Sequence, residues 1–480
     1  MTISVFGNYT RFVILALCTL CATLITSNNR ILNFTIICMK REDGTNSTSI
    51  YDYSQNQRGW LFSAIAIGSL FGTLPITELV SRFGMRRIMT IYGLISSTAT
   101  LLSPLAASYG FVWIFLARAI QGFAFTATFA ANGTVTVNWA TLSGAGFFVG
   151  LLSSHLQLAS MFANPLASAF CVSSVGWAGV FYLQGALTLL ISLLLFYFYR
   201  DSPRNHRFVT ETELKLIEAG KTHGPQKRHR TPYLAICTDI RVIGLCCSWL
   251  AETSVFQLFL QYGPVYLSEV LHQNVKTIGI AIALTYLICF IGKILSGQFC
   301  DYATCLSEKS RILLLTTSCT IIKTGCFAVL ISISEGQALL RWVAFTTILL
   351  FVSVMGIPLM KGAHLVGRQA VPSICHDHLH WGPDTSSHDV SSNDTSSRTF
   401  HLTDRSSYGQ IISQTFYLTV SLSHGHIISQ IEHISKLCYF ELFSLLHAQY
   451  PGRTTWRYKL FAPLPLSPPP AHPPNHPPGP

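Results

Sequence analysis

Six ionisable side chains lie inside long apolar stretches of the chain, where no water would solvate a charge. In chain order they are Arg30, Arg118, His155, Glu252, Lys293 and Lys323. Placing a charge in hydrocarbon costs on the order of a few kcal/mol, so such groups usually bind a substrate, bind or exchange an ion, or pair with one another. The first five are therefore our candidate substrate-binding or ion-coupling residues.

Glu252 is the hardest of these to explain as a purely structural residue, because it lies in an apolar run from Trp249 to Tyr266. It could bind a cation, exchange a proton, or pair with a base such as Lys293. A structural pair and a transport role are equally open. Lys293 and Lys323 are lone positive charges in their stretches, and extension to the water interface or a partner carboxylate is the simpler interpretation of both.

The remaining candidates divide in a similar way. Arg118 could reach interfacial water, but its position beside Gln121 favours a structural or gating role over substrate contact. Arg30 could bind an anion or reach water at the end of its stretch. His155, followed by an Asn-Pro pair in the same stretch, indicates a polar, kinked helix that faces a cavity.

The composition of the chain indicates the element that positions these residues. Half of the residues are hydrophobic and 11% are charged, whereas soluble proteins average about a quarter charged residues. Stretches of about 20 apolar residues, the length that crosses a bilayer, recur along the chain. We predict an all-α membrane bundle with spans near 12–39, 60–80, 88–108, 111–138, 147–170, 177–199, 242–270, 277–300, 312–334 and 338–360.

The positive charges predict the orientation of this bundle. With the N-terminus inside, the basic residues concentrate in cytosolic loops, as the positive-inside rule requires. The net charge of +11 therefore reflects topology, and we expect lipid rather than nucleic acid as the partner. Asn46 begins a glycosylation sequon in the first outer loop. The fourteen cysteines lie mostly in apolar runs, and we expect no disulfide framework among them.

A basic turn between two spans gives the strongest local signal. Gly68 and Gly72 leave one helix face bare enough for another backbone to approach. The helix then ends in Ser81–Arg87, and the next apolar run follows at once. A related turn follows Gly297 in the second half, so the chain has the duplicated organisation of many transporters. We predict a cytosolic gating motif of Arg82, Gly84, Arg86, Arg87 and Asp301.

Four regions follow from this organisation. Residues 1–199 form a six-helix bundle, and residues 200–241 form a central cytosolic loop whose short helix opens with a Thr210-x-x-Glu213 capping box. Residues 242–370 form a second bundle of four spans. Residues 371–480 are a divergent, His/Ser/Pro-rich and largely disordered tail. Its alternating histidines at 376, 378 and 380 could be read as a metal site, but incidental composition is favoured, so we expect no metal and no cofactor.

Several motifs spread over residues 11–370 together resemble one known family. They include Gly59, Pro75, Arg118-Ala119-Ile120-Gln121-Gly122, Gly176-Trp177, Asp201-Ser202-Pro203 and Pro264-Val265-Tyr266-Leu267. This set resembles the anion:cation symporter branch of the major facilitator superfamily, which holds sodium–phosphate cotransporters, sialin and vesicular glutamate carriers. The resemblance implies alternating access, with symport of a small organic anion or inorganic phosphate with Na⁺ or H⁺. It also implies a plasma, vesicular or lysosomal membrane.

The chain departs from that family at defined positions. Ser81 stands where the turn normally has an acidic residue, and Phe125 stands where proton-linked members have a glutamate. Asn29 takes the place of the first-span arginine, with Arg30 one residue away, and Glu252 that of a seventh-span arginine. The last two spans of the family also have no counterpart. The alternative is a non-transporting, truncated membrane protein, or the product of a mispredicted or alternatively spliced message.

Overall fold

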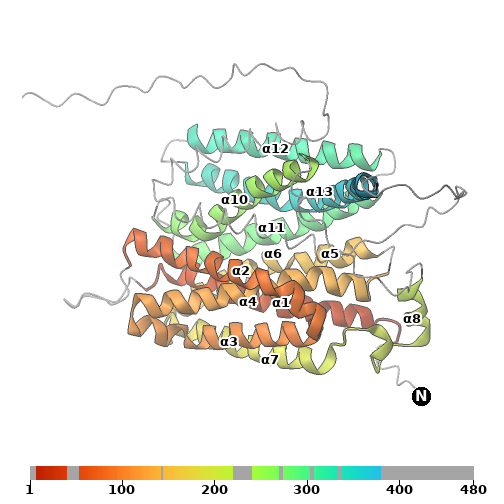
Figure 1. Ribbon diagram of the computed structural model, residues 1–480. Helices are drawn as coiled ribbons and strands as arrows, with labels where there is room; N and C mark the ends of the chain where they lie inside the picture. Colours follow the sequence, from red (N-terminus) through yellow and green to blue (C-terminus); the bar gives the residue numbers. More distant parts are fainter. Residues whose placement is uncertain are drawn as a thin grey trace, which may run out of the picture.

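The computed structural model describes residues 7–39, 53–141, 144–219, 240–269, 274–302, 307–332 and 337–379. These residues form two layers of long helices stacked on each other (Figure 1). The first layer contains α1 (Thr10–Thr35), α2 (Gln55–Phe83), α3 (Met85–Tyr109), α4 (Phe111–Trp139), α5 (Ala145–Ser153), α6 (His155–Val172) and α7 (Ala178–Phe198). The second contains α10 (Ile240–Glu269), α11 (Val275–Tyr302), α12 (Glu308–Ser332) and α13 (Ala338–Leu379). We call these layers the first and second helix groups.

Eight helices in the described part are long and apolar enough to cross a membrane. They are α1, α2, α3, α4, α7, α11, α12 and α13. The other two predicted spans, 147–170 and 242–270, are helical but are not among these eight. The first is divided at Ser154 into the short α5 and the polar α6, and the second is α10, which carries Glu252 and several hydroxyl and amide side chains. Helix α13 continues to Leu379, past the boundary predicted at 370.

The close approach predicted at Gly68 and Gly72 is confirmed, because α2 crosses α4 at these glycines. A Cβ atom on Gly68 would lie 1.8 Å from the carbonyl oxygen of Ala119, and one on Gly122 would lie 2.1 Å from that of Ile65. No side chain fits at such a distance. The two backbones therefore pack directly against each other, as small residues allow in membrane helices.

The basic turn between α2 and α3 is also confirmed. Gly84 connects the two helices with φ of +80°, a left-handed conformation that favours glycine. The Asp201 carboxylate accepts a hydrogen bond from the Arg86 backbone N–H at 2.9 Å, which satisfies one free donor at the start of α3. Because Asp201 follows α7, this contact fixes the end of α7 to the α2–α3 turn.

The predicted short helix of the central loop is α8 (Glu211–Glu218), which lies at the end of the first group (Figure 1). Thr210 caps it by accepting a hydrogen bond from the Glu213 N–H at 3.2 Å. The other half of the predicted capping box does not form, because the buried Glu213 carboxylate accepts instead from the Arg11 N–H at 2.9 Å. Helix α8 is thus docked on the start of α1.

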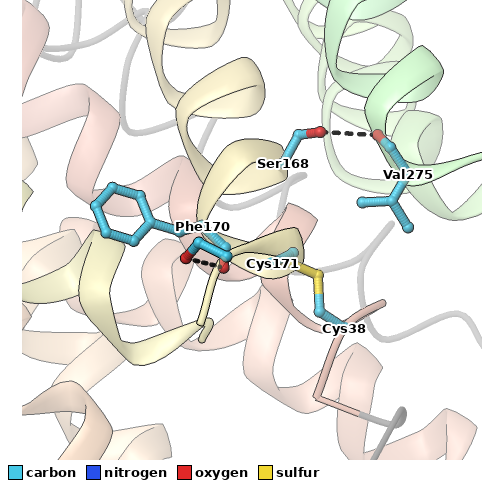
Figure 2. Close-up of a disulfide and its surroundings, with 6 residues drawn as sticks. Cys38, Ser168, Phe170, Cys171 and Val275 are labelled. Carbon is cyan, nitrogen blue, oxygen red and sulfur yellow. Dashed lines mark hydrogen bonds between the residues drawn. A yellow bond between two sulfur atoms is a disulfide. The ribbon is translucent and has the colours of Figure 1, made fainter. Parts of the chain in front are cut away.

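One disulfide occurs in the described part of the chain, where we expected membrane-tolerant cysteines without a disulfide framework. Cys38, just after α1, is bonded to Cys171 in the last turn of α6, with the two Cα atoms 5.8 Å apart (Figure 2). Cys38 precedes the connection that holds Asn46, which lies outside the described residues. Disulfides persist in oxidising compartments, so the bridge agrees with the predicted outward side of this connection.

Candidate functional site

The two helix groups meet where α6 packs along α11. Near the disulfide, the Ser168 hydroxyl donates to the carbonyl oxygen of Val275 at 2.9 Å (Figure 2). A Cβ atom on Gly279 would lie 2.5 Å from the Cβ of Ser168, so the two helices approach closely here. The polar residues described below lie along this junction.

His155 begins α6 directly after the division at Ser154 and is fully buried. Its Nδ1 lies 2.7 Å from the carbonyl oxygen of Leu152. A carbonyl can only accept, so Nδ1 carries the hydrogen and the neutral ring has its lone pair on Nε2. Within the described residues, Nε2 is buried without a hydrogen-bond partner. One face of the site therefore presents an unused acceptor.

Lys293 reaches the same place from α11 in the second group. Its ammonium donates to the carbonyl oxygen of Ser153 at 3.0 Å and lies 3.5 Å from Oε1 of Gln157. Ser153 is the last residue of α5, where a carbonyl lacks its helical partner. Both oxygens are neutral, so these hydrogen bonds leave the lysine charge uncompensated. Lys293 is thus buried, and it pairs with no carboxylate among the residues that the structure describes.

Arg30 supplies the third basic group, from α1. It is buried, and its helix α1 packs against α6, which carries His155. Helix α11, which carries Lys293, packs against α6 as well. The helices of three candidates far apart in the sequence therefore come together at α6. We call Arg30, His155 and Lys293 the basic site.

The surroundings of the basic site contain further polar residues, of which sequence analysis singled out only Asn164, in the Asn-Pro pair after His155. The Gln157 amide donates to the Ser353 hydroxyl of α13 at 3.4 Å. Tyr286 and Asn164 line a small pocket beside α10. Each of these residues is polar and lies in an apolar stretch, and this pattern could have identified it as a candidate. The sequence does not tell which face of the helix such a residue occupies.

Arg118 is buried in α4 and bonds to residues of α1 and α2. Its guanidinium donates to the carbonyl oxygen of Asn29 at 2.8 Å and to Oδ1 of Asn33 at 3.0 Å, and its Nε lies 3.4 Å from the carbonyl oxygen of Leu61. These bonds tie α4 to α1 and α2. Of the structural and gating roles predicted for Arg118, this geometry favours the structural one.

Glu252 has a partner other than the one considered. Its carboxylate forms a hydrogen-bonded ion pair with Lys323, and both side chains are buried between α10 and α12. A pair with a base was one of the options left open, and the base is Lys323 because Lys293, the example named, faces the first group from α11. The pair lies within the second group, so it does not join the basic site.

The contacts of Arg82 and Arg86 in the predicted gating motif stay within the first group. Arg82 pairs with Glu78 on the exposed side of α2 at 2.5 Å. The Arg86 side chain donates to the carbonyl oxygen of Phe196 at 2.8 Å and lies over its ring. Asp301 lies near the end of α11, but its side chain falls outside the described part, so a contact between the groups stays a prediction.

Comparisons with known proteins agree with this architecture. A family model described as Major Facilitator Superfamily matches residues 15–371. Sodium-dependent phosphate transport protein 1 of Mus musculus is 26% identical over 297 residues, which cover 59% of this chain and 64% of that protein. A probable small intestine urate exporter of Mus musculus is 28% identical over 254 residues, covering 53% of this chain and 51% of the relative. The chain thus spans between half and two thirds of the length of these relatives.

A solved structure supports the fold independently of sequence. The crystal structure of a D-xylose–proton symporter aligns with a TM-score of 0.63 at 12% identity, over 91% of this chain and 97% of that chain. Its low identity limits the conclusion to the fold. The helical architecture, the matched family model and the phosphate-transporter relatives lead to one conclusion: the chain is an integral, multi-pass member of the major facilitator superfamily, on its anion:cation symporter branch.

Proposed function

We propose that this protein is a secondary carrier that moves a small organic anion or inorganic phosphate across its membrane. The observation that carries the proposal is the basic site, where buried cationic groups from both helix groups meet. The hydrogen bonds of Lys293 go to neutral oxygens, so an anion would supply the missing negative charge. Phosphate and urate are the first probes, since they occur in the names of relatives.

The location of the site supports alternating access as the mechanism. Arg30 and His155 belong to the first group and Lys293 to the second, so an anion bound among them would contact both groups. Rocking one group against the other would then open the site to one side at a time. The contact between Ser168 and Val275 near the disulfide would have to open for the outward-facing state.

The remaining predicted elements take their places in this proposal. Charge-assisted contacts of Arg82, Arg86, Arg87 and Asp301 would form and break on the cytosolic side, next to the turn at Gly84. Asn46 would carry a glycan on the opposite side. The membrane would be the plasma membrane or that of a vesicle or lysosome, and Na⁺ or H⁺ would be the coupling ion.

Uptake into proteoliposomes tests the proposal. Radiolabelled phosphate and urate are offered under an imposed Na⁺ or H⁺ gradient, to the wild type, to K293M and to the matched control K276M. Lys276 is an exposed lysine on the same helix as Lys293. We expect gradient-dependent uptake by the wild type and K276M, and its loss in K293M. Folded wild-type protein that moves neither anion under either gradient would favour the non-transporting alternative.

A further inference from the structure

We infer that two arginines at one end of the first helix group, Arg86 and Arg200, bind the headgroup of an anionic phospholipid. Arg86 is the second residue of α3, and Arg200 follows the end of α7 by two residues. Such a lipid site is independent of the anion transport proposed above. Three features support it: the position of the two guanidinium groups beside each other, their unused hydrogen-bond donors, and their depth in the membrane.

The two guanidinium groups meet at a single carbonyl oxygen. Nε of Arg86 donates to the carbonyl oxygen of Phe196 at 2.8 Å, and Nη1 of Arg200 lies 3.5 Å from the same oxygen. Arg200 also donates to the carbonyl oxygens of Tyr197 and Tyr199, both at 2.9 Å. Cations interact favourably with the last carbonyls of a helix, which explains why both arginines are held at the end of α7. The same contacts hold two positive charges side by side.

Among the described residues, no carboxylate forms an ion pair with either of these side chains. Asp201 is the neighbour of Arg200 in the chain, but its carboxylate accepts from the backbone N–H of Arg86 instead. The ion pairs described in the first group lie elsewhere, as that of Arg204 with Glu218 does. Both guanidinium groups are therefore able to pair with an anion from outside the chain.

The unused donors favour a phosphate group as this anion. A guanidinium has five N–H donors in a planar fork. In the described part of the chain, the bonds of these two arginines occupy only Nε of Arg86 and Nη1 of Arg200, and none of their other nitrogens is buried. Arginine forks match the oxygens of a phosphate and often bind two of them at once.

The depth of the two arginines indicates that the phosphate belongs to a lipid. They lie at the ends of two helices long and apolar enough to span the membrane, α3 and α7, which pack together on the side of the first group away from the second (Figure 1). The Arg86 guanidinium lies over the Phe196 ring, 4.3 Å from its centroid. That ring is 44% exposed and the next one, Tyr197, 65%. Exposed aromatic rings at the end of a span lie at headgroup level, so acyl chains would pack beside them.

The predicted orientation places this site in the leaflet that is rich in anionic lipid. The positive-inside rule puts the α2–α3 turn and the end of α7 on the cytosolic side. Anionic lipids concentrate in the cytosolic leaflet, and basic pockets between spanning helices there bind their headgroups. A phosphate shared by Arg86 and Arg200 would join the start of α3 to the end of α7. It would thus reinforce the contact that Asp201 already makes between them.

Native mass spectrometry of the full-length protein in neutral detergent tests the site. The probes are phosphatidylserine and phosphatidylinositol 4-phosphate, with phosphatidylcholine as the lipid without net charge. The wild type is compared with R86Q/R200Q and with the matched control R82Q/R204Q, which removes two arginines that are already paired with glutamates. We expect R86Q/R200Q to bind both anionic lipids about thirtyfold more weakly, the combined contribution of two basic residues near a membrane surface. The control should bind them as the wild type does.

Two results would overturn the inference. One is binding of the anionic lipids by R86Q/R200Q as tight as that by the wild type, and the other is wild-type binding of phosphatidylcholine as tight as that of the anionic lipids. Inositol 1,4-bisphosphate, the soluble headgroup of the second probe, separates a lipid from a free phosphate. We expect it not to displace the lipid at equal concentration. Full displacement would show that the site recognises phosphate alone, which contradicts a lipid site.

A second measurement needs no variant, in case R86Q/R200Q fails to fold. Wild-type protein is reconstituted with phosphatidylserine that carries a photoreactive group close to its headgroup, and the crosslinked peptides are identified by mass spectrometry. We expect crosslinks in the peptides that contain Arg86 and Arg200, and their loss when unlabelled phosphatidylserine, but not phosphatidylcholine, is added in excess. Crosslinks confined to other helices, such as α12, would contradict the inference.

Discussion

The two buried lysines of the second helix group have opposite surroundings. Lys323 is paired with Glu252 from the same group, so its charge is compensated within one rigid unit. Lys293 crosses to the first group and donates to the neutral oxygen of Ser153, with a second neutral oxygen, Oε1 of Gln157, at 3.5 Å. The first arrangement is complete without a ligand. The second places uncompensated charge at the junction of two groups, which is where a carrier needs its substrate.

The two described buried histidines repeat this contrast. His206 uses both ring nitrogens: Nε2 lies 3.0 Å from the Phe198 carbonyl, and Nδ1 accepts from the Phe208 N–H at 3.3 Å. His155 uses only Nδ1. A fully bonded histidine holds a loop in place, whereas a half-bonded one keeps a buried ring nitrogen available to a ligand. Both histidines are buried, so the number of bonded ring nitrogens is what distinguishes them.

The largest expected effect tests the compensated lysine. Replacing Lys323 with methionine leaves the Glu252 carboxylate buried without its cation, so K323M should lose about 3–5 kcal/mol of unfolding free energy. The double variant E252L/K323M should recover most of this loss, because no charge remains to be buried. Thermal unfolding in detergent measures both. If K323M were as stable as the wild type, the pair of Glu252 and Lys323 would not have the structural role assigned to it.

The disulfide provides the second prediction, since it stabilises the first group without contacting either lysine. The double variant C38S/C171S should lose about 2–4 kcal/mol, because the bridge closes a long loop of 133 residues. Thermal unfolding with and without reductant measures the loss. Phosphate should still stabilise the variant. If phosphate stabilisation disappeared with the bridge, the basic site would depend on the outer end of α6 more than its contacts indicate.

The pH dependence of stability sharpens the histidine comparison. Burial lowers the pKa of His206 below its ordinary value of 6.5. The unfolded chain therefore binds more protons than the folded chain as pH falls below about 6.5, and stability must fall with it. Denaturation curves between pH 7 and pH 5 should show that H206Q reduces this acid sensitivity, with or without phosphate. An acid sensitivity of H206Q identical to that of the wild type would show that His206 is not responsible.

The smallest effect is expected for the exposed ion pair of Arg82 and Glu78. Both side chains are more than half exposed, and exposed pairs at i, i+4 in a helix contribute about 0.3–0.5 kcal/mol. R82Q should therefore unfold within about 1 °C of the wild type in a thermal melt, given how little such a change shifts the midpoint. If R82Q lost as much unfolding free energy as K323M, solvent exposure would not distinguish a weak ion pair from a strong one in this protein.

The sequence was sufficient for features that are local or that repeat. Helix positions follow from the length of each apolar stretch, and the α2–α3 turn follows from Gly84 among basic residues. The close approach at Gly68 follows from the spacing of small residues alone. Each of these depends on residues close together in the chain, so each could be predicted before any fold was known.

The features that were not predicted depend on contacts between distant segments. The break between α5 and α6 at Ser154 contains no proline or glycine. The carbonyl of Ser153, just before the break, accepts a hydrogen bond from Lys293 of the second group. Cys38 and Cys171 are joined only because α1 and α6 end on the same side. The partner of Glu252 depends on how α10 and α12 are rotated about their axes. The basic residues of the site were all named from the sequence, but their meeting place required the packing of α1, α6 and α11.

The most direct test of the central claim is the thermal stabilisation of the purified protein by phosphate and urate. A ligand at about 100 times its dissociation constant adds about 2.7 kcal/mol to the unfolding free energy. We predict a concentration-dependent rise in the melting temperature of the wild type and of K276M, and none for K293M. A wild type that neither anion stabilises, or a K293M variant stabilised as much as the wild type, would contradict an anion site at Arg30, His155 and Lys293.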